Sequence, residues 1–216
     1  MIKLINDDCM NVIKKYDDDH FDLAIVDPPY SNDTKSLDRL LQDMKGRKAS
    51  AGITRTNTLK NMQPKDEYWN ELFRVSKNQI IWGVNWYEKI FGVGRIVWDK
   101  CNDKSKFFSD CELAYQSFNR KTVKFQYMWN GMLQEDMKNK EIRIHPTQKP
   151  VKLYEWLLHN YSKKGQKILD THLGSGSIGI ACHYFGVDLV GVEIDEEYFQ
   201  EAKKRIDLLT RQTTIF

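Results

Sequence analysis

Residues 167–193 carry the sequence KILDTHLGSGSIGIACHYFGVDLVGVE. A short apolar run ends at Asp170, a Gly-rich turn follows, and a longer apolar run stops at Gly186 before another short run ends at Glu193. This order predicts a strand, a turn, a helix with a Gly stop and a second strand, which together form half of a nucleotide-binding α/β unit. The glycines of such a unit let a ligand approach the backbone, and its acidic residue accepts hydrogen bonds from ribose hydroxyls. We therefore predict an α/β fold with a nucleoside site at this turn.

A second informative stretch is Asp27-Pro28-Pro29-Tyr30, here called the Asp27 turn, which follows the apolar run of residues 23–26. The two prolines lack N–H donors and hold φ near −65°, so the turn is stiff and its carbonyls are available. A carboxylate, carbonyls and an aromatic ring are thereby presented at the C-terminal end of a predicted strand. This set suits a planar amine, whose hydrogens need acceptors and whose ring can stack. A plain Pro-Pro turn that closes a strand is the alternative.

The glycines of the Gly-rich turn also allow a different interpretation. Gly174, Gly176 and Gly179 spell G-x-G-x-x-G, and Glu193 lies at about the distance of the dinucleotide fingerprint, which keeps a nicotinamide oxidoreductase open. A dinucleotide fold needs two mononucleotide halves in succession, whereas only one helix, about residues 196–211, is predicted after Glu193. If the other strands come from the N-terminal part, the sheet is circularly permuted, which favours a nucleoside-sized cofactor.

Three motifs in order carry a family resemblance. The Asp27 turn, His-Pro-Thr-Gln-Lys-Pro at residues 145–150 and Leu-Gly-Ser-Gly-Ser at residues 173–177 resemble the beta class of S-adenosylmethionine-dependent amino-methyltransferases of DNA, in which the catalytic motif precedes the cofactor motif. The resemblance covers nearly the whole chain. The sequence departs from the common family pattern at the Gly-rich turn, where Thr171, His172 and Ser177 replace Pro, Phe and Thr.

The resemblance implies direct transfer of a sulfonium methyl group to the exocyclic amine of a base flipped out of the duplex. Tyr30 would stack on the base, and Asp27 and the Pro28 carbonyl would accept the amine hydrogens, with Pro29 completing the motif. In this class Asp-Pro-Pro-Tyr accompanies adenine N6 more often than cytosine N4, so adenine N6 leads and cytosine N4 is the alternative. A catalytically idle DNA-binding relative is a further alternative.

The resemblance also implies the residues that hold S-adenosylmethionine. Glu193 would bind the ribose hydroxyls, Asp8 would lie near the adenine amine, and Asp170 with the two glycines would surround the methionine part. The segment that holds Lys149 closes over the methionine end in the family. The complete expected set is Asp8, Asp27, Lys149, Asp170, Thr171, His172, Gly174, Ser175, Gly176, Glu193 and Ile194.

Composition agrees with a single methyltransferase domain over residues 1–216, with a catalytic half (1–144), a cofactor-binding half (145–216) and no separate target-recognition domain. The chain has 216 residues, of which 41% are apolar and 29% charged, as in an ordinary globular protein. No apolar stretch approaches the ~20 residues of a membrane span, and residues 1–8 do not resemble a signal peptide, so we expect a cytoplasmic protein of a prokaryotic cell or its phage. The cysteines show no C-x-x-C spacing and no Pro-Cys pair, so the sequence predicts no metal and no cytosine-C5 chemistry.

The net charge of +3 is small, but its distribution is uneven. Between Met44 and Lys65 there are six basic residues and no acidic one. We predict that this basic stretch contacts the phosphates of double-stranded DNA, and the alternative is an ordinary solvated loop. A homodimer is compatible with the sequence. The basic residues are Lys45, Arg47, Lys48, Arg55, Lys60 and Lys65.

The remaining patterns complete a mostly parallel sheet in a circularly permuted, Rossmann-like methyltransferase fold. Residues 111–118 and 122–129 predict an antiparallel hairpin at its edge, because apolar and polar residues alternate strictly in the second run. The aromatic residues of that run are expected in the core rather than on a base platform. Further strands are predicted at residues 3–5, 79–83 and 95–98, and further helices at residues 9–16, 66–75 and 151–161.

Overall fold

The computed structural model describes residues 1–29, 63–102, 109–130 and 133–211. These residues form one eight-stranded sheet with the strand order β1-β8-β7-β2-β3-β5-β4-β6. In chain order the elements are β1 (Ile2–Asn6), α1 (Cys9–Ile13), β2 (Leu23–Val26), α3 (Asp66–Val75), β3 (Gln79–Trp82), β4 (Arg95–Asp99), β5 (Cys111–Gln116), β6 (Thr122–Gln126), α4 (Val151–Tyr161), β7 (Lys167–Asp170), α5 (Ser177–Phe185), β8 (Asp188–Glu193) and α6 (Glu196–Thr210).

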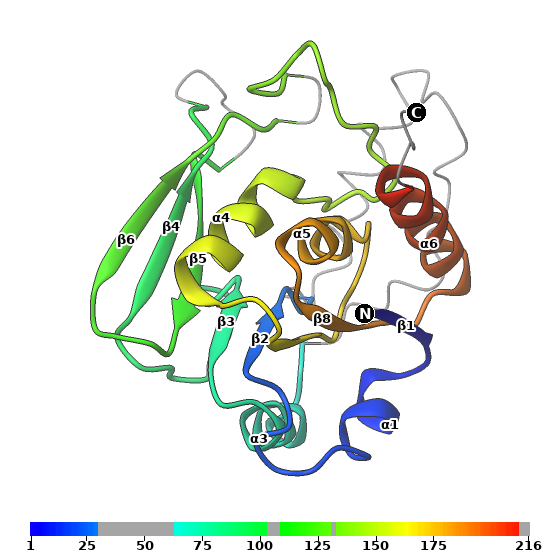
Figure 1. Cartoon of the computed structure of the whole chain (residues 1–216). Coiled ribbons are helices and arrows are strands. Elements are labelled where there is room, and N and C mark those ends of the chain that lie inside the picture. Colours follow the sequence, from blue (N-terminus) through cyan, green and yellow to red (C-terminus); the bar gives the residue numbers. More distant parts are fainter. Residues whose placement is uncertain (30–62, 103–108, 131–132, 212–216) are drawn as a thin grey trace.

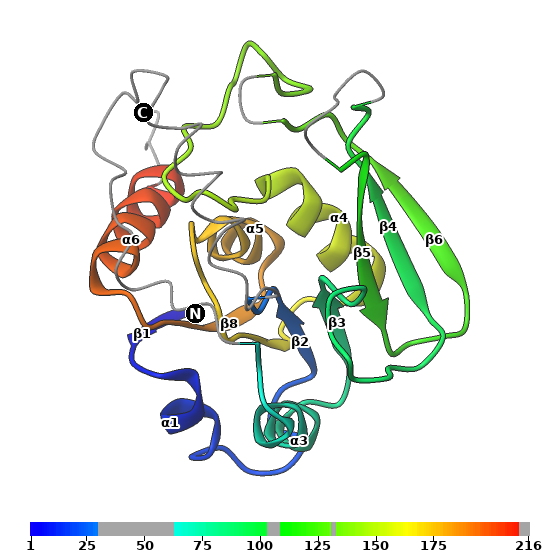
Figure 2. The same cartoon turned by 180° about the vertical axis from the view of Figure 1, so that it is seen from behind.

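Helices cover both faces of the sheet. Helices α4, α5 and α6 lie on one face, and α1 and α3 lie on the other (Figures 1 and 2). Two apolar cores follow from this arrangement, because successive strand residues point to opposite faces. Leu23 and Ile25 of β2 pack with α4 and α5, whereas Ala24 and Val26 of the same strand pack with α3. The strand is buried on both faces, which explains its uninterrupted apolar sequence.

The sheet is mainly parallel and its order is permuted, as predicted. Strands β1 and β2, from the N-terminal part, flank the pair β8 and β7 from the C-terminal part, and all four are parallel. Strand β5 alone among the described strands runs antiparallel to its neighbours. The two predicted halves of the chain therefore interleave in one sheet rather than forming separate sheets.

The predicted hairpin of residues 111–129 is wrong. Strand β4 lies between β5 and β6, pairing antiparallel with β5 and parallel with β6. Gly94 permits this crossing, because a Cβ atom there would collide with the backbone oxygens of Gln116 and Asn119. Alternation predicted the strands correctly, but it cannot identify their partners. The aromatic residues are core as expected, since Phe125 and Trp129 are buried.

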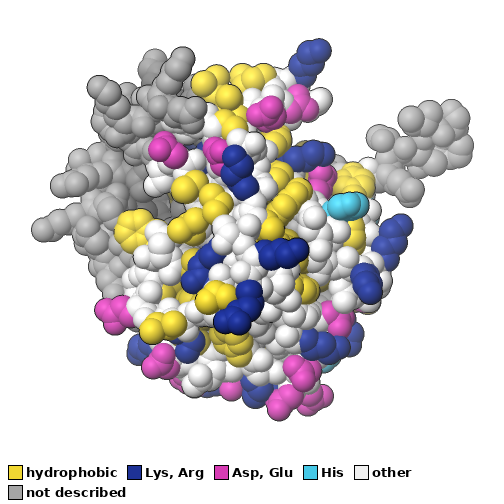
Figure 3. All heavy atoms as spheres, turned by 90° about the vertical axis from the view of Figure 1, so that its left-hand side faces the viewer, with side chains coloured by type: hydrophobic (Ala, Val, Ile, Leu, Met, Phe, Trp, Pro, Cys, Tyr) yellow, Lys and Arg dark blue, Asp and Glu magenta, His cyan; other side chains and the backbone are white. Residues whose placement is uncertain are grey.

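Strand β6 is the outer strand on this side of the sheet. Basic side chains lie across the face seen from that side, among scattered apolar ones (Figure 3). Lys124 projects from β6 and is exposed, which discourages pairing of this edge with another strand. In the part of the chain that the structure describes, no helix has the length and apolar character needed to cross a bilayer.

Candidate active site

Four neighbouring strands end in a carboxylate at the same edge of the sheet. Asp8 follows β1, Glu193 ends β8, Asp170 ends β7 and Asp27 follows β2, in the spatial order of those strands. The C-terminal ends of parallel strands meet at one edge, which is where open α/β sheets bind ligands. The fold thus brings the predicted cofactor carboxylates next to the Asp27 turn, although Glu193 is 166 positions from Asp27 in the sequence.

The Gly-rich turn needs its glycines for different reasons. Gly174 and Gly176 adopt φ values of 52° and 71°, which side chains with a Cβ rarely tolerate. At Gly176 a Cβ would also lie 2.8 Å from Cδ1 of Ile206 in α6. Gly179 lies inside α5, where a Cβ would meet the same Ile206 atom. The third glycine of the G-x-G-x-x-G pattern therefore serves helix packing, and the first two shape the turn.

Glu193 ties this turn to the end of β8. Its Oε2 accepts a 2.8 Å hydrogen bond from the Gly174 N–H, and its Oε1 accepts a 3.0 Å bond from the Asp195 N–H. Burial raises the pKa of the Glu193 carboxyl, and the two backbone N–H groups oppose that rise. The next residue, Ile194, is 67% exposed. At this edge of the sheet, the Glu193 carboxylate, a hydrogen-bond acceptor, is thus followed by the exposed apolar side chain of Ile194.

Asp170 is buried at the centre of the row. Its side chain is 2% exposed and accepts a 3.0 Å hydrogen bond from the His172 N–H. Burial, together with the nearby charges of Asp27 and Glu193, raises the pKa of this carboxyl to about 8. A cationic group bound beside Asp170 would favour the ionised form. Without such a group, the carboxyl is largely protonated near pH 7.

Two of the three departures from the family pattern in this turn, Thr171 and His172, are accommodated by polar contacts. Oγ1 of Thr171 lies 2.7 Å from the Tyr68 hydroxyl and 2.9 Å from Nδ1 of His172. The Tyr68 and His172 rings also meet edge to face, with centroids 5.6 Å apart. Burial lowers the pKa of His172 to about 4, so its ring is neutral near pH 7. A hydrogen-bonded chain from α3 thus supports the turn where the family commonly has Pro and Phe.

Asp8 and Ser175 have local partners. Asp8 caps α1, accepting a 2.8 Å hydrogen bond from the Met10 N–H. Ser175 is buried, and its hydroxyl lies 3.1 Å from that of Ser177 at the start of α5. These bonds hold both residues at the edge, and their contact with a cofactor stays a prediction.

The Asp27 turn is held from both faces of the sheet. From the α4 side, the buried Lys149 ammonium binds Oδ2 of Asp27 and lies 3.1 Å from Oε2 of Glu112. From the α3 side, the Tyr87 hydroxyl donates a 2.7 Å hydrogen bond to the Pro28 carbonyl. Pro28 is buried and Pro29 is half-buried. Tyr30 lies outside the described residues.

Sequence reasoning placed Lys149 at the cofactor, whereas its side chain reaches the Asp27 turn. It also missed Glu112 and Tyr87. For Glu112 a signal existed, because it alternates in phase with the buried Ala114 of β5 and so points to the core face. A carboxylate on a core face requires a charged partner. For Tyr87, in an irregular segment, no such signal existed.

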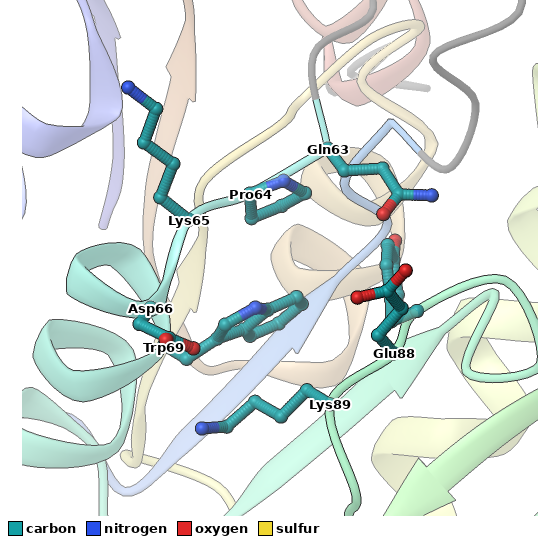
Figure 4. Close-up of a pocket in the computed structure, with 8 residues that line it drawn as sticks. Gln63, Pro64, Lys65, Asp66, Trp69, Glu88 and Lys89 are labelled. Carbon is teal, nitrogen blue, oxygen red and sulfur yellow. The ribbon is translucent and has the colours of Figure 1, made fainter.

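A cavity of about 340 Å³ adjoins the α3 side of the Asp27 turn. It lies between the start of α3 and the segment after β3, with Trp69 at its floor and side chains of both charges at its rim (Figure 4). Tyr87 lines this cavity and binds the Pro28 carbonyl, which connects the two features. Lys65 also lines it. The other members of the basic stretch, Lys45, Arg47, Lys48, Arg55 and Lys60, lie outside the described residues.

Comparisons with known proteins agree with this geometry. A family model described as DNA methylase (N6_N4_Mtase) matches residues 99–204. Type II methyltransferase M2.DpnII of Streptococcus pneumoniae is 23% identical over 94% of this chain and 89% of its own length. Type II methyltransferase M.HpaI of Haemophilus parainfluenzae is 39% identical over 69 residues, which span 32% of this chain and only 22% of that relative.

A solved structure shares the fold. It is that of TTHA0409, described as a putative DNA modification methylase from Thermus thermophilus, in complex with S-adenosyl-L-methionine. The TM-score is 0.60 at 16% identity, and the match covers 98% of this chain and 97% of the other.

Proposed function

Because this chain belongs to the N6/N4 family of DNA methylases, we propose that it transfers the methyl group of S-adenosylmethionine to the N6 amine of adenine in double-stranded DNA. The observation that carries the proposal is the adjacency of β7 and β2 in the sheet. It brings the Gly-rich turn beside the Asp27 turn, so that a cofactor and a base can meet at one edge.

The carboxylate row fits S-adenosylmethionine. The ribose hydroxyls of S-adenosylmethionine are hydrogen-bond donors, and Glu193 would accept from them. Its ammonium group is a cation, and Asp170 would face it. The exposed Ile194 can cover an adenine ring. When bound, S-adenosylmethionine supplies an electrophilic methyl group on sulfur. The remaining cofactor residues, Asp8, Thr171, His172, Gly174, Ser175 and Gly176, would shape the surrounding backbone.

At the other side of the edge, the Asp27 turn would hold the target amine. The Asp27 carboxylate and the Pro28 carbonyl accept its two hydrogens, which directs the nitrogen lone pair toward the methyl carbon. The new N–C bond would form as the methyl–sulfur bond breaks, with S-adenosylhomocysteine as the leaving product. Positive charge develops on the nitrogen in this step, the carboxylate stabilises that charge, and the methylated amine then releases one proton. Tyr30 would stack on the base after it leaves the duplex. The amine proton becomes acidic only after transfer, so Asp27 need not remove it beforehand.

Adenine N6 is preferred over cytosine N4 on the Asp-Pro-Pro-Tyr sequence. The family that matches this chain includes both specificities, so cytosine N4 is the second candidate. Both bases present an exocyclic amine beside a ring nitrogen acceptor, and the same two acceptors suit either. The alternative of a nicotinamide oxidoreductase is disfavoured, because the family model that matches residues 99–204 is one of DNA methylases.

The test is methyl transfer followed by identification of the product. The purified chain is incubated with tritiated S-adenosylmethionine and unmethylated double-stranded DNA, and the digested nucleosides are separated by mass spectrometry. We expect N6-methyladenine. N4-methylcytosine would favour the second candidate, and cofactor binding without transfer to any tested DNA would favour an idle DNA-binding relative. Binding of NAD instead of S-adenosylmethionine would refute the proposal.

A further inference from the structure

The Lys149 side chain lies between two carboxylates from different strands. Its ammonium binds Asp27 and lies 3.1 Å from Oε2 of Glu112, and the side chain is 3% exposed. The other oxygen of Glu112 binds the Lys100 ammonium. Four charges of alternating sign therefore form a chain, here called the charge chain, that begins at Asp27.

The sheet register builds this arrangement. Val26 of β2 pairs with Ile81 of β3, so Asp27 is beside Trp82. Trp82 in turn pairs with Ala114 of β5, two residues beyond Glu112. Residues two apart on a strand share a face, so Glu112 lies on the same face as Asp27. Rigid strands, rather than loops, thus set the spacing of the two carboxylates.

Lys149 reaches this face from the segment that precedes α4. Its Nζ lies 5.6 Å from the centroid of the Trp82 ring. Its backbone carbonyl, by contrast, accepts a 2.7 Å hydrogen bond from the hydroxyl of Ser177, at the start of α5. Lys149 therefore contacts the Gly-rich turn through its backbone and the Asp27 turn through its side chain.

Glu112 keeps its charge in this setting. Burial by itself would raise the pKa of the carboxyl, but the ammonium groups of Lys149 and Lys100 outweigh it and hold the pKa at about 2. Glu112 is therefore ionised throughout the neutral range, so the Lys149 ammonium has one anionic partner in Asp27 and a second in Glu112. The ammonium contacts both carboxylates, and its contact with Asp27 is the shorter of the two.

Two buried donors mark the same region. Among the described residues, Nε1 of Trp82 and Nδ2 of Asn102 are buried side-chain nitrogens without a hydrogen-bond partner. Trp82 lies beneath the Lys149 ammonium, and Asn102 follows Lys100 by two residues. Buried donors are normally paired, so these two are exceptions in the described part of the chain.

We propose that the charge chain belongs to the target-base half of the site, with Glu112 as a positioning residue that holds the Lys149 ammonium against Asp27. This inference rests on the proposed methyl transfer and names residues that serve it. The Asp27 carboxylate is thereby kept in one orientation, with Lys149 on its α4 side. Lys149 is assigned to the base rather than to the methionine end of the cofactor.

Glu112→Gln tests the assignment because it keeps the shape of the side chain and removes the charge. The ammonium then loses one of its two anionic partners, so both the ammonium and the Asp27 carboxylate that it orients are held less firmly. We expect kcat for DNA methylation to fall by about 10- to 100-fold, as for small misplacements of a reacting group. The dissociation constant for S-adenosylmethionine should stay within about threefold of wild type, because no side chain of the charge chain would touch the cofactor.

A second variant separates positioning from folding. Glu112→Gln combined with Lys100→Met removes one charge of each sign, so the buried cluster stays balanced while the Glu112 anion is still missing beside Lys149. Its kcat should remain as low as that of Glu112→Gln even where its melting temperature is closer to wild type. The control is Glu155→Gln, which removes a carboxylate from the exposed pair with Lys152 on α4 and should leave kcat unchanged.

The outcomes are distinct. Wild-type kcat in Glu112→Gln, full recovery in the double variant, or a loss of cofactor affinity that parallels the loss of kcat would each overturn the inference, the last by returning Lys149 to the cofactor. The proposed function fails separately and first, if the wild-type chain methylates no DNA, and the inference then falls with it.

Discussion

The Tyr87 hydroxyl donates a 2.7 Å hydrogen bond to the carbonyl oxygen of Pro28. Proline has no N–H with which to anchor this part of the turn. The Tyr87 side chain, from the segment after β3, orients it instead. A carbonyl oxygen has two lone pairs, which leaves one for a substrate amine. The acceptor that the proposed mechanism uses is thus also a structural anchor.

Tyr87→Phe should therefore impair catalysis without affecting the cofactor. Loss of a hydrogen bond with a net value of about 0.5–1.5 kcal/mol corresponds to a roughly two- to tenfold fall in kcat if the orientation of the carbonyl is what it supplies. The dissociation constant for S-adenosylmethionine, measured by calorimetry, should not change. Tyr184→Phe is the control, since its hydroxyl also donates to a backbone carbonyl but lies at the surface near the end of α6. Equal effects of the two variants would contradict the assignment.

Asp27→Ala should abolish methyl transfer and leave cofactor affinity within a few-fold of wild type. The prediction follows from placing Asp27 on the target amine. The fold should survive, because the buried Lys149 keeps Glu112 as an ionic partner. Tritium incorporation and a calorimetric titration on the same preparation decide it. Near-normal turnover would remove Asp27 from the mechanism.

Glu193→Ala should weaken S-adenosylmethionine binding by at least about tenfold, since charge-assisted hydrogen bonds contribute roughly 1.5–3 kcal/mol. Part of this loss would be indirect, because the carboxylate also holds the N–H groups of Gly174 and Asp195. Asp188→Ala is a matched control on the same strand, where the carboxylate binds the exposed N-terminus. An unchanged dissociation constant would move the ribose contact elsewhere, with Asp195 as the next candidate.

Asp170→Asn should stabilise the protein without its cofactor, and more so as the pH rises. The folded-state pKa of about 8 lies above the ordinary value of 3.8, so the stability that the protonated carboxyl contributes is complete below about pH 4 and is lost as the pH rises toward 8. Asparagine cannot ionise and avoids this loss, while it can still accept the bond from His172. The melting temperature of the variant minus that of wild type should grow by at least about 2 °C between roughly pH 5 and pH 8, because 1 kcal/mol shifts a domain of this size by about 2–4 °C.

The same variant should bind S-adenosylmethionine more weakly, since it lacks the negative charge that would face a cation. A pH-independent difference in melting temperature would show that Asp170 is not the titrating group.

Neutralising three residues of the basic stretch, Lys45, Arg47 and Lys48, should flatten the plot of log affinity for DNA against log salt by about 2–3 units, at roughly 0.9 per lost phosphate contact. The loss should be nearly uniform across DNA sequences, because phosphate contacts position a protein without reading bases. Fluorescence anisotropy measures both. Neutralising the exposed Lys163 and Lys164, which precede β7 and so lie at the opposite edge of the sheet, should have little effect. A wild-type slope in the first variant would leave this stretch an ordinary loop and direct attention to Lys100, Lys104 and Lys106.

Local patterns in the sequence determined most elements of the fold. The apolar runs of β2, β7 and β8 and the helical spacing of α3, α4 and α6 were predicted within a few residues. The Gly-rich turn was predicted as well, because positive φ at Gly174 and Gly176 is a requirement of a few adjacent residues. The permuted, mainly parallel sheet followed from the order of the motifs along the chain.

Strand partners and ion pairs were decided only by the tertiary structure. Strand β4 pairs with both β5 and β6, and the sequence did not predict this because alternation within one strand carries no information on its neighbours. Lys149 and Asp27 lie 122 positions apart, and the pair forms because the fold removes both from water, where each charge needs a close partner of opposite sign. The sequence by itself thus determined the strand ends and the turns that place the candidate residues at one edge of the sheet. The mutual contacts of these residues depend on burial and on hydrogen bonds between distant strands, which exist only once the chain has folded.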